Sequence, residues 1–439
     1  PQDGYDIVST INVNIQDIAH HALLKQLEHY QAEHGTVIVM EVATGKVKAM
    51  VNLGRTDKGT YFEKLNYAIG ESHEPGSTFK LMAFMAALED KVIDTSTIID
   101  TQHGVKHFLG RNIYDAKRGG YGKISAARVM EVSSNIGIAT VIHDNYSKNP
   151  EKFLNHLKKW RLDQPTGISI KGEGMPVIPG PGHKLWSKNA LPSMSYGYNL
   201  RLTPLQTLTF YNAVANNGVM VKPRFVDEVR MSSDNIITYE TEILNPKICS
   251  DETLSQVREI LKNAVKRGTG RSLYSPEFSM AGKTGTAQTE YWMADWKANP
   301  RYVSSFAGFF PAENPKYSCI VVIHKPSTRI GYYGGDVSGP VFKRIAQKIY
   351  SESSLIEEIE DGNPKHPSLD EKFDDYYAKL HNAEQKIPNV KGMPAMDAIA
   401  LLENLGLKVR IVGRGRVNDQ SLLPGEMLKK GQEIVLKLS

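Results

Sequence analysis

Ser77 and Lys80 form a Ser-x-x-Lys pair at the start of a long apolar segment. If that segment is a helix beginning at Pro75, the two side chains lie one turn apart on the same face. A serine hydroxyl is a weak nucleophile until a base takes its proton, and a lysine can do so only when burial or a second cation keeps it neutral. The pair therefore predicts a nucleophile and its base, although about one Ser-x-x-Lys is expected by chance in a chain of this length.

A second polar group lies at Ser133, Ser134 and Asn135, inside or beside another segment with a helical pattern. A hydroxyl at this position could relay a proton to a leaving amine, and an asparagine offers one donor and one acceptor to a substrate amide. Taken alone, these residues are better explained as polar helix positions or as a helix cap.

A third group, Lys283, Thr284, Gly285 and Thr286, falls in a segment expected to be a strand. Glycine inside a strand often marks a place where a ligand or another backbone comes close. The lysine and the two threonine hydroxyls would present a cation and hydrogen-bond donors to a carboxylate. Alone, the same residues would fit an edge strand with a bulge.

These groups need a scaffold that brings distant segments together. Residues 36–42 and 47–51 flank a Thr-Gly turn and predict a β-hairpin. Further strands are expected near residues 8–13 and over 278–288, 303–310 and 318–324, and helices over 15–34, from Pro75, and over 126–142, 203–216 and 340–351. We therefore expect an α+β domain whose antiparallel sheet pairs N-terminal with C-terminal strands and is flanked by helices.

Composition and charge suggest a folded chain of two domains. Of 439 residues, 41% are hydrophobic and 23% charged, which excludes disorder and fibrous repeats. The net charge of +5 comes without a dense basic patch, so nucleic-acid binding is not expected. Ten acidic and three basic residues between 351 and 385 predict an acidic linker, which would separate a domain at 1–350 from a small module at 386–439.

Neither the cysteines nor the histidines predict a metal site. Cys249 and Cys319 are too few for a disulfide framework or a zinc site. His20, His21 and His29 spread over about half the circumference of their predicted helix. No metal site is therefore expected, and nothing in these residues indicates a cofactor.

Together, and in this order, the three polar groups supply a nucleophile, a base, a relay, an amide clamp and a carboxylate site. With them the chain resembles the class B penicillin-binding proteins, which are D,D-transpeptidases of cell-wall synthesis. The likeness extends to the surroundings of the first and third groups, to residues 203–206 and 213–216, and to residues 386–439, which are similar to a single PASTA module. The resemblance implies a penicillin-binding transpeptidase domain of the serine β-lactamase-like fold.

The resemblance also implies roles for individual residues. Ser77 would attack the penultimate D-alanine of a peptidoglycan stem peptide, and Lys80 would accept the serine proton. Ser133, with Lys80 and Lys283, would pass a proton to the departing D-alanine, while Asn135 would hold the substrate amide and orient Lys80.

The third group would bind the substrate. Thr284, Gly285 and Thr286 would receive its terminal carboxylate, and the backbone N–H groups of Ser77 and Thr286 would form the oxyanion hole. Tyr291 and Trp292 follow closely, and we hypothesise that they form an aromatic wall beside the site; packing on the domain surface is the alternative. Asn199 stands where relatives often have a glycine, which leaves the shape of that loop open.

The expected partners are stem peptides, β-lactam antibiotics and, for the full-length protein, a glycosyltransferase and division proteins. The resemblance places the domain on the extracytoplasmic face of a bacterial membrane, anchored by an N-terminal helix outside this sequence. The sequence context is most similar to the septal, FtsI-like branch. Elongation-type or sporulation-type transpeptidases remain alternatives, as do a D,D-carboxypeptidase, a β-lactamase, and a non-catalytic sensor or wall-binding scaffold.

Overall fold

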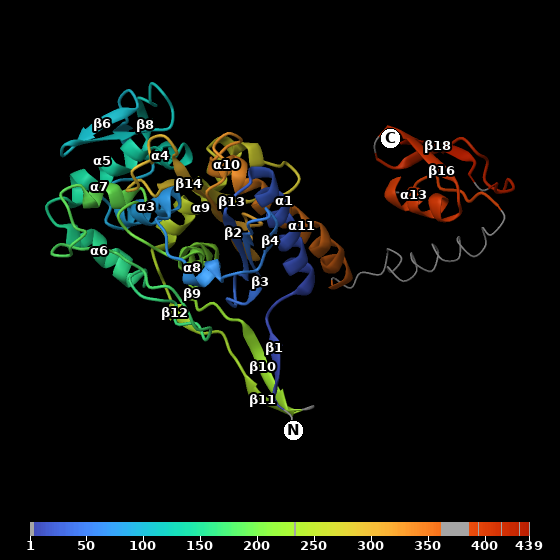
Figure 1. Cartoon of the computed structure of the whole chain (residues 1–439), viewed down its shortest axis with the longest axis horizontal. Helices are drawn as coiled ribbons and strands as arrows, with labels where there is room; N and C mark the ends of the chain where they lie inside the picture. Colours follow the sequence, from blue (N-terminus) through green and yellow to red (C-terminus); the bar gives the residue numbers. More distant parts are fainter. Residues whose placement is uncertain are drawn as a thin grey trace. The chain divides into compact units, whose positions relative to one another are not determined.

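A computed structural model describes residues 4–231, 234–360, 386–393, 395–413, 415–429 and 431–438. The chain divides into two compact units, Pro1–Ser351 and Glu352–Ser439, whose elements are labelled in Figure 1. Within the described ranges, we find no helix whose length and apolar character would suffice to cross a lipid bilayer.

The first unit is built on a six-stranded antiparallel sheet of order β13-β14-β15-β2-β3-β4. Its strands are β2 (His34–Glu41), β3 (Val47–Arg55), β4 (Tyr61–Phe62), β13 (Ala281–Thr289), β14 (Arg301–Phe310) and β15 (Tyr317–His324). The N-terminal strand β2 pairs with the C-terminal strand β15, with Ile38 opposite Ile320. The predicted hairpin and the predicted pairing of the two ends of the domain are both confirmed.

Helices and four small sheets surround this sheet. The helices are α1 (Val13–Tyr30), α2 (Tyr67–Gly70), the 3₁₀ helix η1 (Gly76–Phe79), α3 (Lys80–Glu89), α4 (Ala126–Glu131), α5 (Asn135–Tyr146), α6 (Pro150–Lys159), α7 (Ala190–Ser195), α8 (Pro204–Ala215), α9 (Asp251–Arg267), the 3₁₀ helix η2 (Arg271–Leu273), α10 (Gly334–Val337) and α11 (Gly339–Glu360). The small sheets are β1 (Asp6–Ser9) with β10 (Val226–Met231) and β11 (Asp234–Thr238), β5 (Ile98–Asp100) with β8 (Lys123–Ser125), β6 (Val105–Phe108) with β7 (Arg111–Tyr114), and β9 (Met220–Val221) with β12 (Ile243–Asn245).

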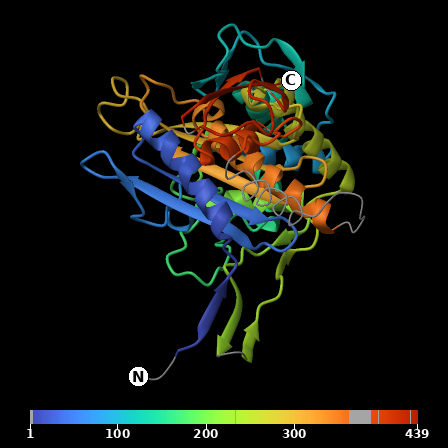
Figure 2. The same ribbon diagram turned by 90° about the vertical axis from the view of Figure 1, so that its right-hand side faces the viewer.

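Successive side chains of β2 point to opposite faces of the sheet, so the apolar core is divided between the two faces. Val37 and Val39 point into a core shared with α1 and α11, whereas Ile38 and Met40 point into a larger core with α3 and α8. Figures 1 and 2 show the helices on both sides of the strands. Because full burial of one such side chain contributes about 1.5–3 kcal/mol, both faces hold the strands in register. The predicted α+β class, an antiparallel sheet flanked by helices, is confirmed.

Three ends of helices differ from the positions that the sequence predicted. The Asn12 side chain accepts from the Ile15 backbone N–H, so α1 begins at Val13, which had been expected in a strand. The same helix ends at Tyr30, and His34 opens β2. The last helix, α11, runs to Glu360 and so into the predicted linker; the rest of that linker, 361–385, lies outside the described residues.

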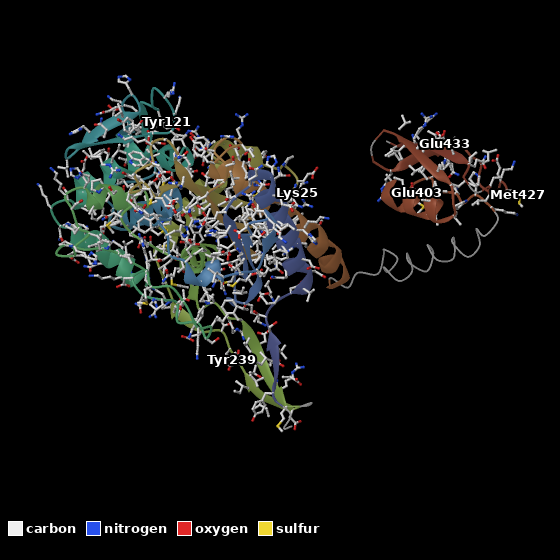
Figure 3. The ribbon with its side chains drawn as sticks, in the orientation of Figure 1. Lys25, Tyr121, Tyr239, Glu403, Met427 and Glu433 are labelled. Carbon is white, nitrogen blue, oxygen red and sulfur yellow. The ribbon has the colours of Figure 1, made fainter. Side chains whose placement is uncertain are left out.

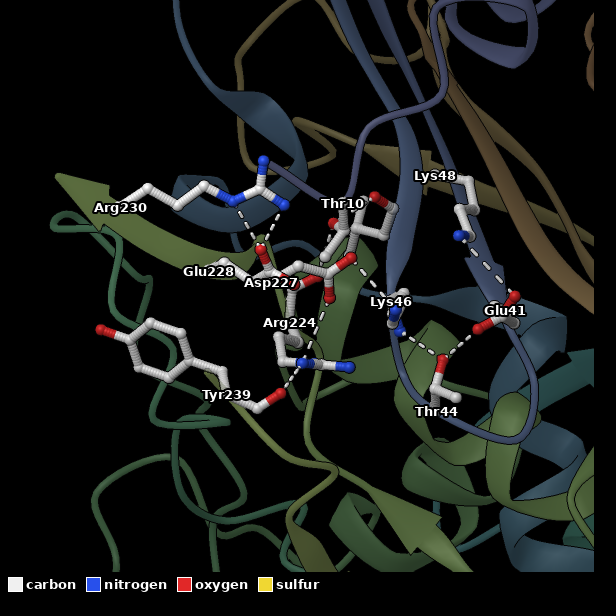
Figure 4. A network of polar contacts seen from close by, with 11 residues as sticks. Thr10, Glu41, Thr44, Lys46, Lys48, Arg224, Asp227, Glu228, Arg230 and Tyr239 are labelled. Carbon is white, nitrogen blue, oxygen red and sulfur yellow. Dashed lines mark hydrogen bonds and ion pairs between the residues drawn. The ribbon is translucent and has the colours of Figure 1, made fainter. Parts of the chain in front are cut away.

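A three-stranded arm of β1, β10 and β11 extends from the body of the first unit (Figures 1 and 2). A polar network at its root joins it to β3 (Figure 4). Asp227 accepts from Lys46 at 3.0 Å and pairs with Arg224 at 3.2 Å, while the Thr10 hydroxyl donates to the Val47 carbonyl at 2.6 Å. Tyr239, labelled in Figure 3, lies beside this network with 44% of its surface exposed.

The second unit has its own small core. It comprises α13 (Ala395–Asn404), β16 (Lys408–Val412), β17 (Val417–Gln420) and β18 (Glu433–Leu438), with β18 between the other two strands. The helix packs Leu401 and Leu402 against Ile434 and Leu436 of β18. The sequence pattern also predicts strands over 407–412 and 433–438, which agree with β16 and β18, whereas β17, a short and mostly polar strand, was not predicted.

Candidate active site

The turn that carries Ser77 packs directly against β13. Ser77 lies in η1, and the chain becomes α-helical only at Lys80, so the predicted helix begins with a 3₁₀ turn. Gly76 has a φ of +57°, and a Cβ there would meet the Cβ of Ala287 at 3.0 Å. The Tyr211 hydroxyl of α8 donates to the Thr78 carbonyl at 2.8 Å from the opposite side. The turn is therefore fixed between the third polar group and the core.

Lys80 is fully buried, one turn beyond Ser77. Its Nζ donates to the Ser133 carbonyl oxygen at 2.6 Å and to the Ser133 Oγ at 3.1 Å. Burial lowers the pKa of Lys80 to about 7, against the opposing attraction of the Asp115 carboxylate. A large fraction of this amine is thus neutral near pH 7, which is what a general base requires.

Ser133 sits at a break in the segment that was expected to be one helix. α4 ends at Glu131 and α5 begins at Asn135, so the predicted single helix over 126–142 is wrong at this point. Ser133 has a φ of +59°, a left-handed conformation that is uncommon for a residue with a side chain. Ser134 caps α5 by accepting from the Gly137 N–H at 2.9 Å. The break occurs because serine hydroxyls compete with the helix backbone, and it turns Ser133 toward Lys80.

Asp115 holds this second group in place, and the sequence analysis missed it. Its carboxylate accepts from the Ser134 hydroxyl at 2.8 Å, from the Asn135 N–H at 2.7 Å and from the Ile136 N–H at 3.1 Å. Asn135 Nδ2 donates to the Tyr114 carbonyl at 2.8 Å, and within the described residues it makes no hydrogen bond to Lys80. A negative charge at the start of α5 also suits the helix dipole. Nothing near Asp115 in the sequence forms a motif with the second group.

Lys283 on β13 is also fully buried. Burial, and after it the nearby charge of Lys80, lower its pKa well below the ordinary value. Two ammonium groups buried near each other do not both stay charged, and here the charge of Lys80 favours the neutral form of Lys283. The structure thus brings Lys80, Ser133 and Lys283 to one place.

The hydroxyl groups of the two threonines in the third group contact neighbouring segments of the first unit. Thr284 Oγ1 lies 2.7 Å from Thr269 Oγ1, and Thr286 Oγ1 accepts from the Gly334 N–H at 2.9 Å. Gly285 lies between them, where a Cβ would meet Thr78 Cγ2 at 3.1 Å and overlap the Ser305 hydroxyl. The prediction of a close approach at this glycine agrees with that geometry.

The loop before Leu200 completes the surroundings of Ser77. The Gly76 N–H donates to the Gly197 carbonyl at 3.1 Å. Gly197 has a φ of +86°, and a Cβ there would overlap the Gly76 carbonyl oxygen. Asn199 has a φ of +61°, so it adopts the left-handed conformation that a glycine would, and its N–H donates to Glu74 Oε1 at 2.8 Å.

The two candidate wall residues differ in how firmly they are held. The Tyr291 hydroxyl donates to Glu74 Oε1 at 2.9 Å, and its ring lies 6.2 Å from that of Tyr198. Trp292 is 62% exposed, with its ring edge-on to Tyr291 at 5.4 Å. Both line a cavity of about 600 Å³ that opens beside β13.

Residues 35–347 match the family model described as the penicillin binding protein transpeptidase domain. The chain belongs to this family. Residues 385–439 match the model of the PASTA domain, so both modules that the resemblance implied are confirmed.

Curated relatives of this transpeptidase include stage V sporulation protein D of Bacillus subtilis. It is 26% identical over 453 residues, which cover 100% of this chain and 66% of the relative. The peptidoglycan D,D-transpeptidase FtsI of Buchnera aphidicola is 28% identical over 356 residues, covering 79% of this chain and 58% of the relative. The chain therefore spans less than two thirds of the length of these two relatives.

Solved structures of similar chains support the same assignment. The transpeptidase domain of penicillin-binding protein 3 from Burkholderia pseudomallei has a TM-score of 0.66 at 26% identity, covering 83% of this chain and 100% of that one. Penicillin-binding protein 3 from Mycobacterium tuberculosis, complexed with aztreonam, has a TM-score of 0.69 at 26% identity, covering 80% of each chain.

Proposed function

We propose that this chain is a serine-type peptidoglycan D,D-transpeptidase that works through an acyl-enzyme on Ser77. The observation that carries the proposal is the buried Lys80 amine, whose pKa is lowered to about 7 and which is held by Ser133 one turn from the nucleophile. A relative named a peptidoglycan D,D-transpeptidase supports the reaction class.

In the acylation step, Ser77 Oγ attacks the carbonyl carbon of the penultimate D-alanine while Lys80 Nζ takes the hydroxyl proton. The backbone N–H groups of Ser77 and Thr286 stabilise the oxyanion that forms. The C–N bond then breaks, and the amine of the terminal D-alanine leaves with a proton delivered through Ser133 Oγ. The buried Lys283 lies near Lys80 and would act with it and Ser133 in this transfer.

In the second step, an amine of a neighbouring stem peptide attacks the acyl-enzyme. It forms the crosslink and returns the proton to Ser77. Thr284, Gly285 and Thr286 receive the donor carboxylate, and Asn135 holds the donor amide. Because β13 is an edge strand, the donor peptide can lie along it as an added strand. Tyr291 and Trp292 form the wall of the adjoining cavity.

The same steps explain the proposed sensitivity to β-lactams. Attack of Ser77 on the lactam carbonyl opens the ring, but the amine that leaves stays attached and blocks the acceptor amine. Solved structures similar to this chain include complexes with aztreonam and with ampicillin.

For the biological role we propose wall synthesis at the division septum, with sporulation as a second candidate. The relative named stage V sporulation protein D favours the second, because its similarity extends over 100% of this chain. We also propose that the chain consists of a transpeptidase domain at 1–350, a linker at 351–385 and a PASTA module at 386–439. The catalytic domain would lie on the extracytoplasmic side of the membrane. In the full-length protein, its partners would be a glycosyltransferase and division proteins. The PASTA module would then serve packing or contact with a partner.

Intact-mass spectrometry after incubation with benzylpenicillin tests the reaction. One stable adduct on the parent and none on Ser77→Ala is the expected result. Penicillin consumed without an adduct would mean a β-lactamase. No adduct and no consumption would indicate a non-catalytic scaffold. Release of D-alanine from a stem peptide without a crosslink, when an acceptor amine is present, would indicate a carboxypeptidase.

Asp115→Asn should slow acylation by benzylpenicillin about tenfold or more. The amide oxygen can still accept from the α5 N–H groups, but the amide nitrogen cannot accept from the Ser134 hydroxyl, and the negative charge is lost. Ser133 and Asn135 should therefore be held less firmly. The acylation rate constant under single-turnover conditions measures this. Asp94→Asn, an aspartate that caps an exposed turn, is the matched control and should acylate like the parent. Equal rates for both variants would contradict a positioning role.

A further inference from the structure

Three ionisable side chains from distant parts of the sequence meet beside the cavity next to the active site. His34 opens β2, His324 ends β15 as its register partner, and Glu71 follows α2. One ligand atom from each lies within 4.8 Å of the others. Glu71 Oε2 is 2.7 Å from His34 Nε2 and 3.7 Å from His324 Nε2, so a single carboxylate oxygen faces both rings.

The imidazoles in and beside this group are buried, and one of their ring nitrogens has no hydrogen-bond partner among the described residues. Only 6% of His324 is exposed. His73 places its ring 5.2 Å from that of His324, and its Nδ1 atom is buried without a partner. Buried polar atoms without partners are rare in folded proteins, and an ion or a water is the usual explanation.

The charges around the group favour a bound cation. Glu33 lies 3.6 Å from His34 Nδ1, the place where a carboxylate commonly orients a metal-binding histidine. The adjacent Lys325 is paired with Glu33 at 2.7 Å and with Glu290 at 2.6 Å.

We propose that His34, Glu71 and His324 form a zinc site, with His73 beside it as a fourth ligand. Two imidazoles and one carboxylate are a common ligand set for Zn²⁺. The His34 and His324 rings stack with their centroids 4.2 Å apart, so a shared ion requires one ring to tilt.

The proposed zinc site joins the segment before Ser77 to two strands of the large sheet. Glu71 and His73 belong to the short segment that leads into the turn of Ser77, whereas His34 and His324 lie on adjacent sheet strands. A bound ion would tie the segment before the nucleophile to the ends of β2 and β15. The zinc proposal does not depend on the acyl-transfer proposal, because metal binding is measured directly.

The test uses the whole chain, stripped of metal with a chelator and then dialysed at pH 8 against Zn²⁺. The pH is chosen because zinc binds imidazole and carboxylate groups in their deprotonated forms. We expect one Zn²⁺ per chain by elemental mass spectrometry and a rise in melting temperature of about 3 °C or more at saturating zinc. Co²⁺ in place of zinc should give the strong visible absorption of a four-coordinate ion.

Glu71→Gln keeps the shape of the side chain and should weaken zinc binding about tenfold or more and abolish the rise in melting temperature. His324→Gln is the second variant. His21→Gln, on the exposed face of α1, is the matched control and should bind zinc like the parent. Zinc binding that persists in the first two variants but falls in the control would mean that surface histidines hold the ion, which overturns the proposal. So would the absence of retained zinc in the parent. If neither ligand variant folds, the Co²⁺ spectrum of the parent decides.

Discussion

Replacing Lys80 by methionine should slow acylation of Ser77 by benzylpenicillin by about a thousandfold or more at pH 7.5. Methionine has a similar length and suits a fully buried position, so the fold should persist while the base is lost. The measurement is the rate constant of adduct formation followed by intact mass, with circular dichroism to verify folding. Lys25→Met, at an exposed position of α1 labelled in Figure 3, should acylate at the parent rate.

The pH profile of the parent distinguishes a base from a merely structural lysine. Because the Lys80 pKa is lowered to about 7, raising the pH through 7 converts the amine to its active neutral form. The acylation rate should therefore fall about tenfold for each pH unit below 7 and level off above it. A rate that stays constant between pH 5.5 and 8.5 would show that Lys80 is not the base. Lys80→Met should remove the dependence altogether.

The sequence was sufficient for those parts of the site that depend on local pattern. The hairpin at β2 and β3 follows from two β-branched runs around a Thr-Gly turn. The helix expected over 203–216 is found as α8, and the structure adds that Thr203 and Gln206 form a capping box at its start. The position of Gly285 in a strand that another segment approaches also followed from residue type alone.

What the sequence did not predict depends on contacts between distant segments. The helix break at Ser133 is stabilised by Asp115, which follows strand β7 and so has no signature near the second group. The cluster of His34, Glu71 and His324 exists only because β2 and β15 pair in one register. Periodicity along the chain reports local structure, and it carries no information about which strands become neighbours.

Gly197→Ala should impair acylation far more than the same substitution at Gly182, although both glycines have nearly the same φ angle. Their φ angles are +86° and +88°, so an alanine pays the same local strain of about 1–2 kcal/mol at either site. Around Gly182 nothing lies within 4 Å of the added Cβ, whereas at Gly197 the Cβ overlaps the Gly76 carbonyl oxygen. The difference between the two variants therefore isolates the contact between this loop and the nucleophile turn.

Because Gly76 precedes Ser77, relief of that overlap must displace the nucleophile from Lys80 or from β13. A displacement of about 1 Å at a reacting group can cost a hundredfold in rate, so we expect a loss of that order in Gly197→Ala and almost none in Gly182→Ala. Acylation rates and urea midpoints measured on both proteins separate the catalytic effect from the stability effect. If Gly197→Ala acylates as fast as Gly182→Ala, the loop does not position Ser77, and the close packing at Gly76 serves folding alone.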